Sequence, residues 1–467
     1  MNFKFKQIKD NNINYALTVL AIYGFILLRQ LDRIIHPTLW AEDGTIFLFR
    51  TLTYGVKSIL MPYAGYLQVC PQIVSLISYL ITLKYYPILT LCISSFIYTY
   101  ALSLILDKSY SWMNESVLVR FIFVLSLTFL PGTPEILGNL ANLHSVLFMF
   151  VMIRLLANID KKYTFVDFIL FAMAILSAGE IILAVPLVMY RIFILIKNKM
   201  PIKNIILEFA LLLMVVTATI VNFSFFEHSS FAAGHGFLYY VLLIKNYFPL
   251  FILTVLNRFL FIPFMGPLTI VINKSIIFSL ILGVLLLWFI YSKFKSTIKI
   301  SIRKNMTLYI VMILQMCLIL MVVLARPGAE LTAFMGKLEL VGQLRCRYLF
   351  FLTPFAILFW YVIVNDFLVK LDIFKIVSIR RIMIFIALYV IAINLWTGLI
   401  FFNFYRFGGF QYANQDLWNY NYPQLYNVIK YGNPKTISIP LAPDPKVWKV
   451  QISHDELYNF NNSLILR

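Results

Sequence analysis

The sequence predicts an all-α polytopic membrane protein. Apolar residues make up 61% of its 467 residues and charged residues only 13%, which is about half of the charged share in soluble domains. The apolar residues fall in long runs separated by short polar segments, as in membrane-spanning chains. The net charge of +19 does not indicate nucleic-acid binding, because the basic residues form short clusters between the runs and no basic domain.

Eleven apolar runs are candidate transmembrane helices. They are residues 14–31, 87–106, 117–130, 144–157, 164–176, 181–196, 204–224, 275–292, 306–325, 348–368 and 381–402. Several are shorter than the roughly 20 residues of a perpendicular span, which tilted or paired helices in a bundle accommodate. A further run, 237–262, is either an interfacial helix or a hairpin that would raise the number to thirteen.

Basic clusters predict the orientation, because loops on the cytoplasmic side carry an excess of Lys and Arg. With eleven spans, all clusters fall on one side. They are Lys4, Lys6 and Lys9; Lys108; Lys161 and Lys162; Lys197, Lys199 and Lys203; Lys293, Lys295, Lys299, Arg303 and Lys304; and Lys370, Lys375, Arg380 and Arg381. We therefore expect a multi-pass membrane protein with a cytoplasmic N-terminus and a C-terminus on the outer face, which would be the periplasmic face if the membrane is the bacterial inner membrane that the resemblance given below implies. The first run has no small-residue cleavage site and is expected to be an uncleaved anchor.

The expected transmembrane domain covers residues 1–402, with a first periplasmic loop at 32–86. Within that loop, 45–83 is expected to form helices lying on the outer membrane face, because a crossing there would reverse the charge pattern. Residues 403–467 are polar and rich in Tyr, Asn and Pro. They predict a small periplasmic cap or extended segment, without a clear helix.

The leading candidates for chemistry are Glu42 and Asp43, in the stretch from Trp40 to Gly44 just after the first run. Holding two adjacent acids beside a bilayer costs free energy, so such residues are expected to have a function. A carboxylate there can act as general base on an acceptor hydroxyl. Consecutive helical residues point about 100° apart, so the second acid would orient the acceptor or a divalent metal. No Cys or His spacing indicates a metal site.

Other polar residues are expected at the same outer face. The predicted pocket residues are His36, Trp40, Glu135, Asn142, His144 and Glu180. Arginine binds phosphate bidentately, and the predicted donor-phosphate ligands are Arg326, Arg345 and Arg347. In the alternative interpretation, the isolated acids cap helix ends and the arginines anchor helices at lipid headgroups.

Short stretches of the sequence resemble a bacterial subgroup of the integral membrane glycosyltransferases with the GT-C fold. They are Leu39 to Gly44, Pro62 to Tyr66, Asn139 to His144, and Arg345 to Phe351. The overall layout is similar to that of serotype-converting O-antigen glucosyltransferases. The chain departs from oligosaccharyltransferases, because it has no clear DxD or WWDYG motif.

The resemblance implies transfer of a hexose, such as glucose, from undecaprenyl phosphate to a surface glycan such as the O-antigen of lipopolysaccharide. The first-loop acid of that family acts as base or metal contact, which corresponds here to Glu42 and Asp43. The expected partners are the polyprenyl-phosphate sugar, a lipid-linked or polymeric glycan acceptor and membrane lipids, but no nucleic acid. The alternatives are a lipid-linked sugar transporter or flippase, and an O-antigen polymerase.

Overall fold

The computed structural model describes residues 15–130, 136–226, 245, 248–249, 251–273, 275–325, 352–371, 376–402, 417–442 and 449–461. Within these residues the chain is largely helical, and seven helical segments are long and apolar enough to cross a membrane. They are Tyr86–Leu106, Gly179–Lys197, Ile202–Asn222, Phe251–Leu268, Ile276–Lys304, Leu352–Leu371 and Ile376–Thr397. The coarse prediction of a helical membrane protein is confirmed.

The eleven predicted runs correspond to helices of unequal length. Six of them are among the seven long segments, and the seventh, Phe251–Leu268, overlaps the ambiguous run 237–262. The other five are α1 (Tyr15–Leu28), α6 (Val117–Thr128), α8 (Leu143–Leu156), α9 (Phe165–Ile175) and α16 (Met306–Ala325). The described part of the chain therefore contains both long and short apolar helices.

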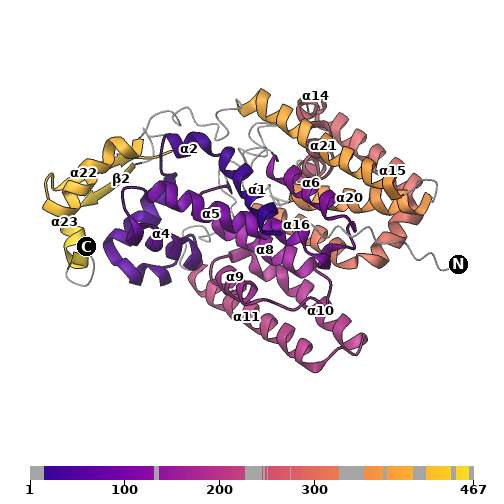
Figure 1. Ribbon diagram of the computed structural model, residues 1–467, viewed down its shortest axis with the longest axis horizontal. Coiled ribbons are helices and arrows are strands. Elements are labelled where there is room, and N and C mark those ends of the chain that lie inside the picture. The colour runs from indigo at the N-terminus through magenta and orange to yellow at the C-terminus, as the bar shows by residue number, and fades with distance from the viewer. Residues whose placement is uncertain are drawn as a thin grey trace.

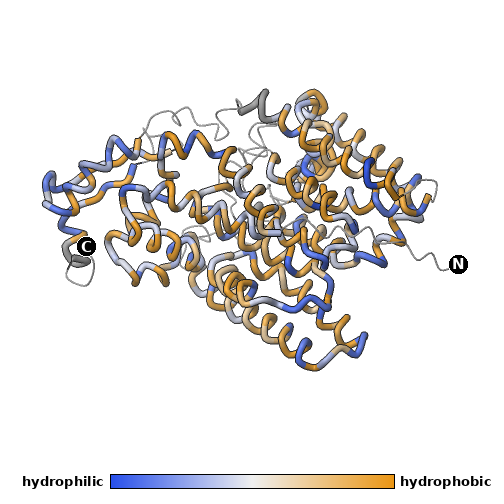
Figure 2. Tube along the Cα trace, viewed as in Figure 1, coloured by the Kyte–Doolittle hydropathy of each residue, from blue (hydrophilic) through white to orange (hydrophobic). Residues whose placement is uncertain are grey.

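The long helices form an elongated bundle with a small cap at one end (Figure 1). Its principal helices are α5 (Tyr86–Ser103), α10 (Val185–Lys197), α11 (Ile202–Phe226), α15 (Ile276–Lys304), α20 (Leu352–Leu371) and α21 (Ile376–Phe402). Figure 2 shows that these helices are mainly hydrophobic, whereas the cap is mainly hydrophilic. One expectation changes here: α15 continues to Lys304, so the basic cluster 293–304 is helical and not a loop.

Helix α8 lies at the centre of the first half of the bundle. It packs on α5, α9 and α16, and nearly all of its residues are buried. A helix that is apolar all round belongs inside a protein or membrane, and the residues from Val146 to Ile153 are all apolar. Polar side chains are confined to the two ends of α8. We call the end at Leu143 the loop end of the bundle and the end at Leu156 the basic end.

Two buried ion pairs lie at the basic end. Arg154 Nε is 3.1 Å from Asp167 Oδ2, and Arg191 Nη2 is 2.9 Å from Glu208 Oε1. Tyr163 joins them, because its hydroxyl donates to Glu208 Oε1 at 2.7 Å and the Arg154 guanidinium lies over its ring. Buried charges of this kind are paired because an isolated buried charge is very costly. These pairs hold the ends of α8, α9, α10 and α11 together.

The first loop folds into short helices, as expected. It contains α2 (Leu31–Ile35), a π-helical turn η1 (Asp43–Leu48), α3 (Phe49–Tyr54), η2 (Gly55–Leu60) and α4 (Val69–Ile81). A buried polar cluster joins these pieces: Ser75 Oγ lies 2.6 Å from both Thr51 Oγ1 and the Tyr86 hydroxyl. Helix α4 packs on α5 and η2, so this loop is a fixed part of the bundle.

The C-terminal segment forms the cap, which is more ordered than the sequence predicts. It consists of α22 (Leu417–Tyr431), an antiparallel hairpin of β1 (Thr436–Pro440) and β2 (Lys449–Ser453), and α23 (His454–Asn461). This small sheet is a departure from an all-α chain. The cap packs on the first loop, because β2 contacts η1 and α23 contacts α3.

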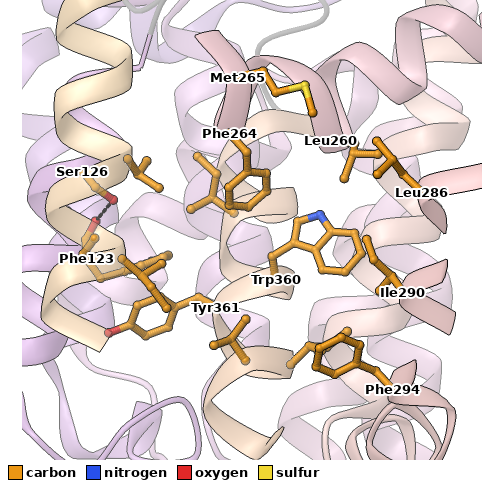
Figure 3. A pocket seen from close by; sticks show the side chains of 16 residues that line it. Phe123, Ser126, Leu260, Phe264, Met265, Leu286, Ile290, Phe294, Trp360 and Tyr361 are labelled. Carbon is orange, nitrogen blue, oxygen red and sulfur yellow. Dashed lines mark hydrogen bonds between the residues drawn. The ribbon is translucent and has the colours of Figure 1, made fainter. Parts of the chain in front are cut away.

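The second half of the bundle contains an apolar cavity of about 280 Å³ between α6, α15, α20, α21 and α13 (Ile262–Met265). Figure 3 shows Trp360, Phe264 and Phe294 on its wall. Two polar groups on this wall are already satisfied, since Trp360 Nε1 donates to the Phe259 carbonyl and Ser126 Oγ to the Phe123 carbonyl. Of the predicted site residues that the structure describes, none lines this cavity.

Candidate functional site

Asp43 joins the first loop to residues 136–142, here called the second loop, which lead into α8. It begins η1, its side chain is 1% exposed, and its Oδ1 accepts a hydrogen bond from the Ala141 backbone N–H at 3.0 Å. Burial raises the pKa of Asp43 to about 7, although the Ala141 N–H and the positive charge of Arg33 favour its ionised form. A carboxyl group with a pKa near 7 is half protonated at neutral pH.

Arg33 makes a second tie between the same two loops. Its Nη1 donates to the Leu137 carbonyl at 2.9 Å, and its Nη2 donates to the Gly138 carbonyl at 3.2 Å. Gly138 has φ +68°, and a Cβ there would lie 2.9 Å from Leu91 Cγ. Glycine is therefore required by both conformation and space. Together, Arg33 and Asp43 fix the segment that leads into α8.

His144 stands in the first turn of α8, between a carboxylate and a phenol. Its Nδ1 lies 3.1 Å from Glu180 Oε1, and its Nε2 lies 3.3 Å from the Tyr66 hydroxyl. Ser145 Oγ donates to the same Glu180 oxygen at 3.0 Å. An ionised carboxylate only accepts hydrogen bonds, so Glu180 favours the imidazole tautomer with its proton on Nδ1. The Nε2 lone pair is then available to accept a proton.

The Tyr66 ring packs closely against the backbone at Gly179, and this contact brings Tyr66 and Glu180 to His144. Glu180 follows Gly179, and a Cβ on Gly179 would lie 3.2 Å from Tyr66 Cδ1. Just after Tyr66, the Cys70 N–H donates to Ser177 Oγ at 2.8 Å. The tyrosine ring thus rests on a glycine, and the two segments are hydrogen-bonded beside it.

Asp43 and the Tyr66–His144–Glu180 cluster both lie near the start of α8. The partner of Asp43 is Ala141, which precedes His144 by only three positions in the sequence. The Cα atoms of these two residues are therefore at most about 11 Å apart. The site combines a buried acid with an imidazole that is about one-tenth exposed. An imidazole oriented by a carboxylate is the arrangement of a general base.

The other predicted residues have different surroundings. Glu42 is half-buried, so it is the more accessible acid of the pair. Trp40 is 7% exposed and pairs through its backbone with Ala442 of the cap. Asn142 is 2% exposed, at the N-cap position of α8. His36 ends α2 and is half-buried.

Four predicted residues lie outside the described residues: Glu135, Arg326, Arg345 and Arg347. Sequence reasoning missed the roles of Arg33 and Ser145, because Arg33 stands at the end of an apolar run and Ser145 beside a histidine. The sequence offered one signal for Tyr66, which is the Pro62-to-Tyr66 stretch with a glycine before the tyrosine.

The Cys70 thiol is free and buried.

Within the part of the chain that the structure describes, no group of three or more His, Cys, Asp or Glu side chains is arranged to hold a metal ion. No protein-family model matches this chain, and neither a curated protein nor a solved structure does. The function is therefore argued from the geometry of the site.

Proposed function

We propose that this protein is a membrane glycosyltransferase of GT-C-like architecture. It moves a hexose, such as glucose, from a polyprenyl-phosphate donor to a surface glycan such as O-antigen at the periplasmic face of the bacterial inner membrane. The observation that carries the proposal is the convergence of Asp43, His144 and Glu180 at one end of the bundle. These residues come from three segments far apart in the sequence, and Tyr66 adds a hydroxyl.

In the proposed reaction, His144 is the general base. The acceptor hydroxyl replaces the Tyr66 hydroxyl as hydrogen-bond partner of Nε2 and gives its proton to this nitrogen. The acceptor oxygen then bonds to the anomeric carbon of the hexose. The bond from this carbon to the phosphate oxygen breaks, and polyprenyl phosphate leaves with the electron pair. Glu180 stabilises the imidazolium that forms, as the carboxylate does in a Ser-His-Asp triad.

The two acids of the first loop have separate roles in this proposal. Asp43 is a positioning residue, because its burial and its bond to Ala141 fix the segment that carries His144. Glu42 is half-buried and would orient the acceptor, or a divalent metal if the reaction uses one. The donor phosphate would be held by Arg326, Arg345 and Arg347, whose fork geometry suits a phosphate.

The arrangement of polar groups in α8 favours transfer over transport. A transporter is expected to place ionisable groups near the middle of its helices. In α8 the ionisable residues lie at the two ends, His144 and Arg154, and the eight residues from Val146 to Ile153 between the polar ends are apolar. The apolar cavity of the second half offers space for hydrocarbon of the lipid carrier.

The proposal is tested by transfer assays on membranes that contain His144→Ala or Glu180→Gln. Loss of a general base typically lowers the rate about 10²- to 10⁴-fold, so His144→Ala should lose at least about a hundredfold. Glu180→Gln should also lose activity, because an amide does not stabilise an imidazolium. Glu456→Gln makes the same chemical change at an exposed position on α23 and serves as the control. Wild-type rates in both site variants at normal expression would contradict the proposal.

A second test addresses the first loop. Replacing Glu42 and Asp43 together with alanine should abolish transfer, since the variant loses both the accessible acid and the tie to Ala141. The measurement is hexose incorporation into the surface glycan, with expression checked by immunoblot. Full transfer by the double variant at normal expression would rule out a role for this pair.

A further inference from the structure

A second cavity, of about 270 Å³, lies at the basic end of the bundle, away from the proposed catalytic site. Its walls come from the ends of α8 and α15, from α10, and from the start of α16. Three lining residues are cationic, Arg191, Arg303 and Lys304, and none of the lining residues is acidic. The cavity therefore offers positive charge to an anion.

The three cations differ in how far they are neutralised. Arg191 is 4% exposed and is paired with Glu208, and it also donates to the Leu155 and Ala157 carbonyls. Lys304 Nζ lies 3.3 Å from Asp366 Oδ1, with its side chain 53% exposed.

Arg303 is exposed, and its side chain forms no hydrogen bond or ion pair with any residue that the structure describes. The uncompensated charge at this cavity is therefore a guanidinium at its rim. A guanidinium presents two parallel donors that match a phosphate group.

Part of the lining is apolar, although Asn158, Asn305 and Thr307 also contribute to it, and this apolar part places the cavity at a hydrocarbon boundary. Leu156, Ile194 and Leu308 contribute aliphatic surface, and α16 is apolar from its first residue, Met306. The aromatic rings of Trp112 and Tyr190 also line the cavity, and such rings are favoured at membrane interfaces. Inorganic phosphate would make no favourable contact with this apolar part of the cavity. A phospholipid has a phosphate for the cationic part and an acyl chain for the apolar part.

We infer that this cavity binds an anionic membrane phospholipid, with the lipid phosphate on Arg303 and Lys304 and the start of an acyl chain against the apolar wall. Basic pockets between transmembrane helices bind anionic headgroups in this way. The inference depends on the chain being a membrane protein and is independent of the proposed transferase activity.

The test is native mass spectrometry of the detergent-solubilised full chain with phosphatidylglycerol, compared with zwitterionic phosphatidylethanolamine. Arg303→Gln should weaken phosphatidylglycerol binding about tenfold, the order expected for loss of hydrogen bonds to a charged group. Lys293→Gln is the matched control, because it removes one positive charge from the same exposed helix, about 15 Å away along α15, and should leave binding unchanged. Both residues are exposed, so both variants should fold.

Three outcomes would overturn the inference. Equal binding of the two lipids would show that no anionic headgroup is recognised. Equal losses in Arg303→Gln and Lys293→Gln would indicate general surface charge and no built site. Displacement of phosphatidylglycerol by millimolar inorganic phosphate would identify a free-anion site.

Discussion

Adjacent residues in the first loop differ sharply in environment, although Glu42 and Asp43 carry the same chemical group. Asp43 is 1% exposed and hydrogen-bonded to Ala141, whereas Glu42 is half-buried. Neighbouring helical side chains point about 100° apart, so one faces the second loop while the other does not. The buried acid suits positioning, and the accessible acid suits contact with a substrate.

The raised pKa of Asp43 predicts a pH-dependent stability. Because the folded state holds this proton more tightly than the unfolded state, stability falls as pH rises from about 4 to about 7 and is constant above that. Between pH 5 and pH 8 the loss should be roughly 3 kcal/mol. Asp43→Asn keeps an acceptor for the Ala141 N–H but cannot ionise. Thermal unfolding in detergent should therefore show a falling midpoint for wild type and a flatter profile for this variant.

Asp455→Asn is the control for this experiment, because Asp455 is exposed on α23. It should retain the wild-type dependence on pH. A slope in Asp43→Asn equal to that of wild type would mean that Asp43 does not titrate in this range.

The sequence could single out this acidic pair but could not predict which member is buried. Two acids after an apolar run are visible in the sequence alone. The burial of Asp43 depends on a backbone N–H that is 98 residues away. In the same way, His144 and Glu180 could each be expected at the outer face, but their 3.1 Å contact depends on how α8 meets the turn at Gly179.

At the level of elements, the cap is attached to the loop that carries the acidic pair. The Trp418 N–H donates to the Pro37 carbonyl at 3.0 Å, and the Ala442 N–H donates to the Leu39 carbonyl at 2.9 Å. A Cβ on Gly44 would lie 2.6 Å from Leu441 Cδ2, so η1 and the cap are in close contact. The C-terminal segment is therefore expected to fix the position of Glu42 and Asp43.

Trp418→Ala tests this attachment. Trp418 is 2% exposed, and its Nε1 donates to the Lys84 carbonyl, so its loss should cost about 3–5 kcal/mol and lower transfer activity. Trp288→Ala removes a tryptophan that is 66% exposed on α15 and should change stability little. Thermal unfolding in detergent compares the two variants. Equal shifts of the unfolding midpoint in the two variants would show that Trp418 contributes no particular stability to the attachment of the cap.

The sequence predicted the helices of the bundle but not the fold of the cap. Each of the eleven apolar runs forms helix, because apolar runs in a membrane must satisfy their backbone groups internally. Helix α22 was not expected, since its segment is polar and contains Pro423. Its burial comes from Leu425 and Val428 in the core shared with Leu39 and Leu48 of the first loop, which is a contact that no local pattern reveals.

At the level of the whole molecule, the apolar middle of α8 separates two polar layers. The candidate site lies at the loop end of α8, and the ion pairs of Arg154 and Arg191 lie at its basic end. With 14 residues, α8 is about 21 Å long. In our proposals the two layers have different functions, with hexose transfer at the loop end and lipid binding at the basic end, where the ion pairs also join the helices.

Glu208→Ala should destabilise the whole bundle. It leaves the buried Arg191 without its acidic partner, which typically costs about 3–5 kcal/mol. Asp366→Ala removes the partner of the half-exposed Lys304 and should cost at most about 1 kcal/mol. Thermal unfolding of the two variants in detergent measures the difference. A smaller shift for Glu208→Ala than for Asp366→Ala would mean that the buried pair does not hold the helices together.

The buried pairs were not predicted, because the members of each pair stand on different helices. Arg154 pairs with Asp167 and Arg191 with Glu208. A signal was present nonetheless: each arginine is an isolated charge inside an apolar run, and such residues in membrane segments usually have a partner.

The central claim, hexose transfer at the loop end, is tested most directly with the purified protein in proteoliposomes. The donor is undecaprenyl phosphate carrying a radiolabelled glucose, and the acceptor is lipopolysaccharide with its O-antigen. Our account predicts that label moves to the glycan with release of undecaprenyl phosphate, and that His144→Ala abolishes this transfer. Label that crosses the bilayer while still attached to its lipid carrier, with none on the glycan, would contradict the account and identify a transporter.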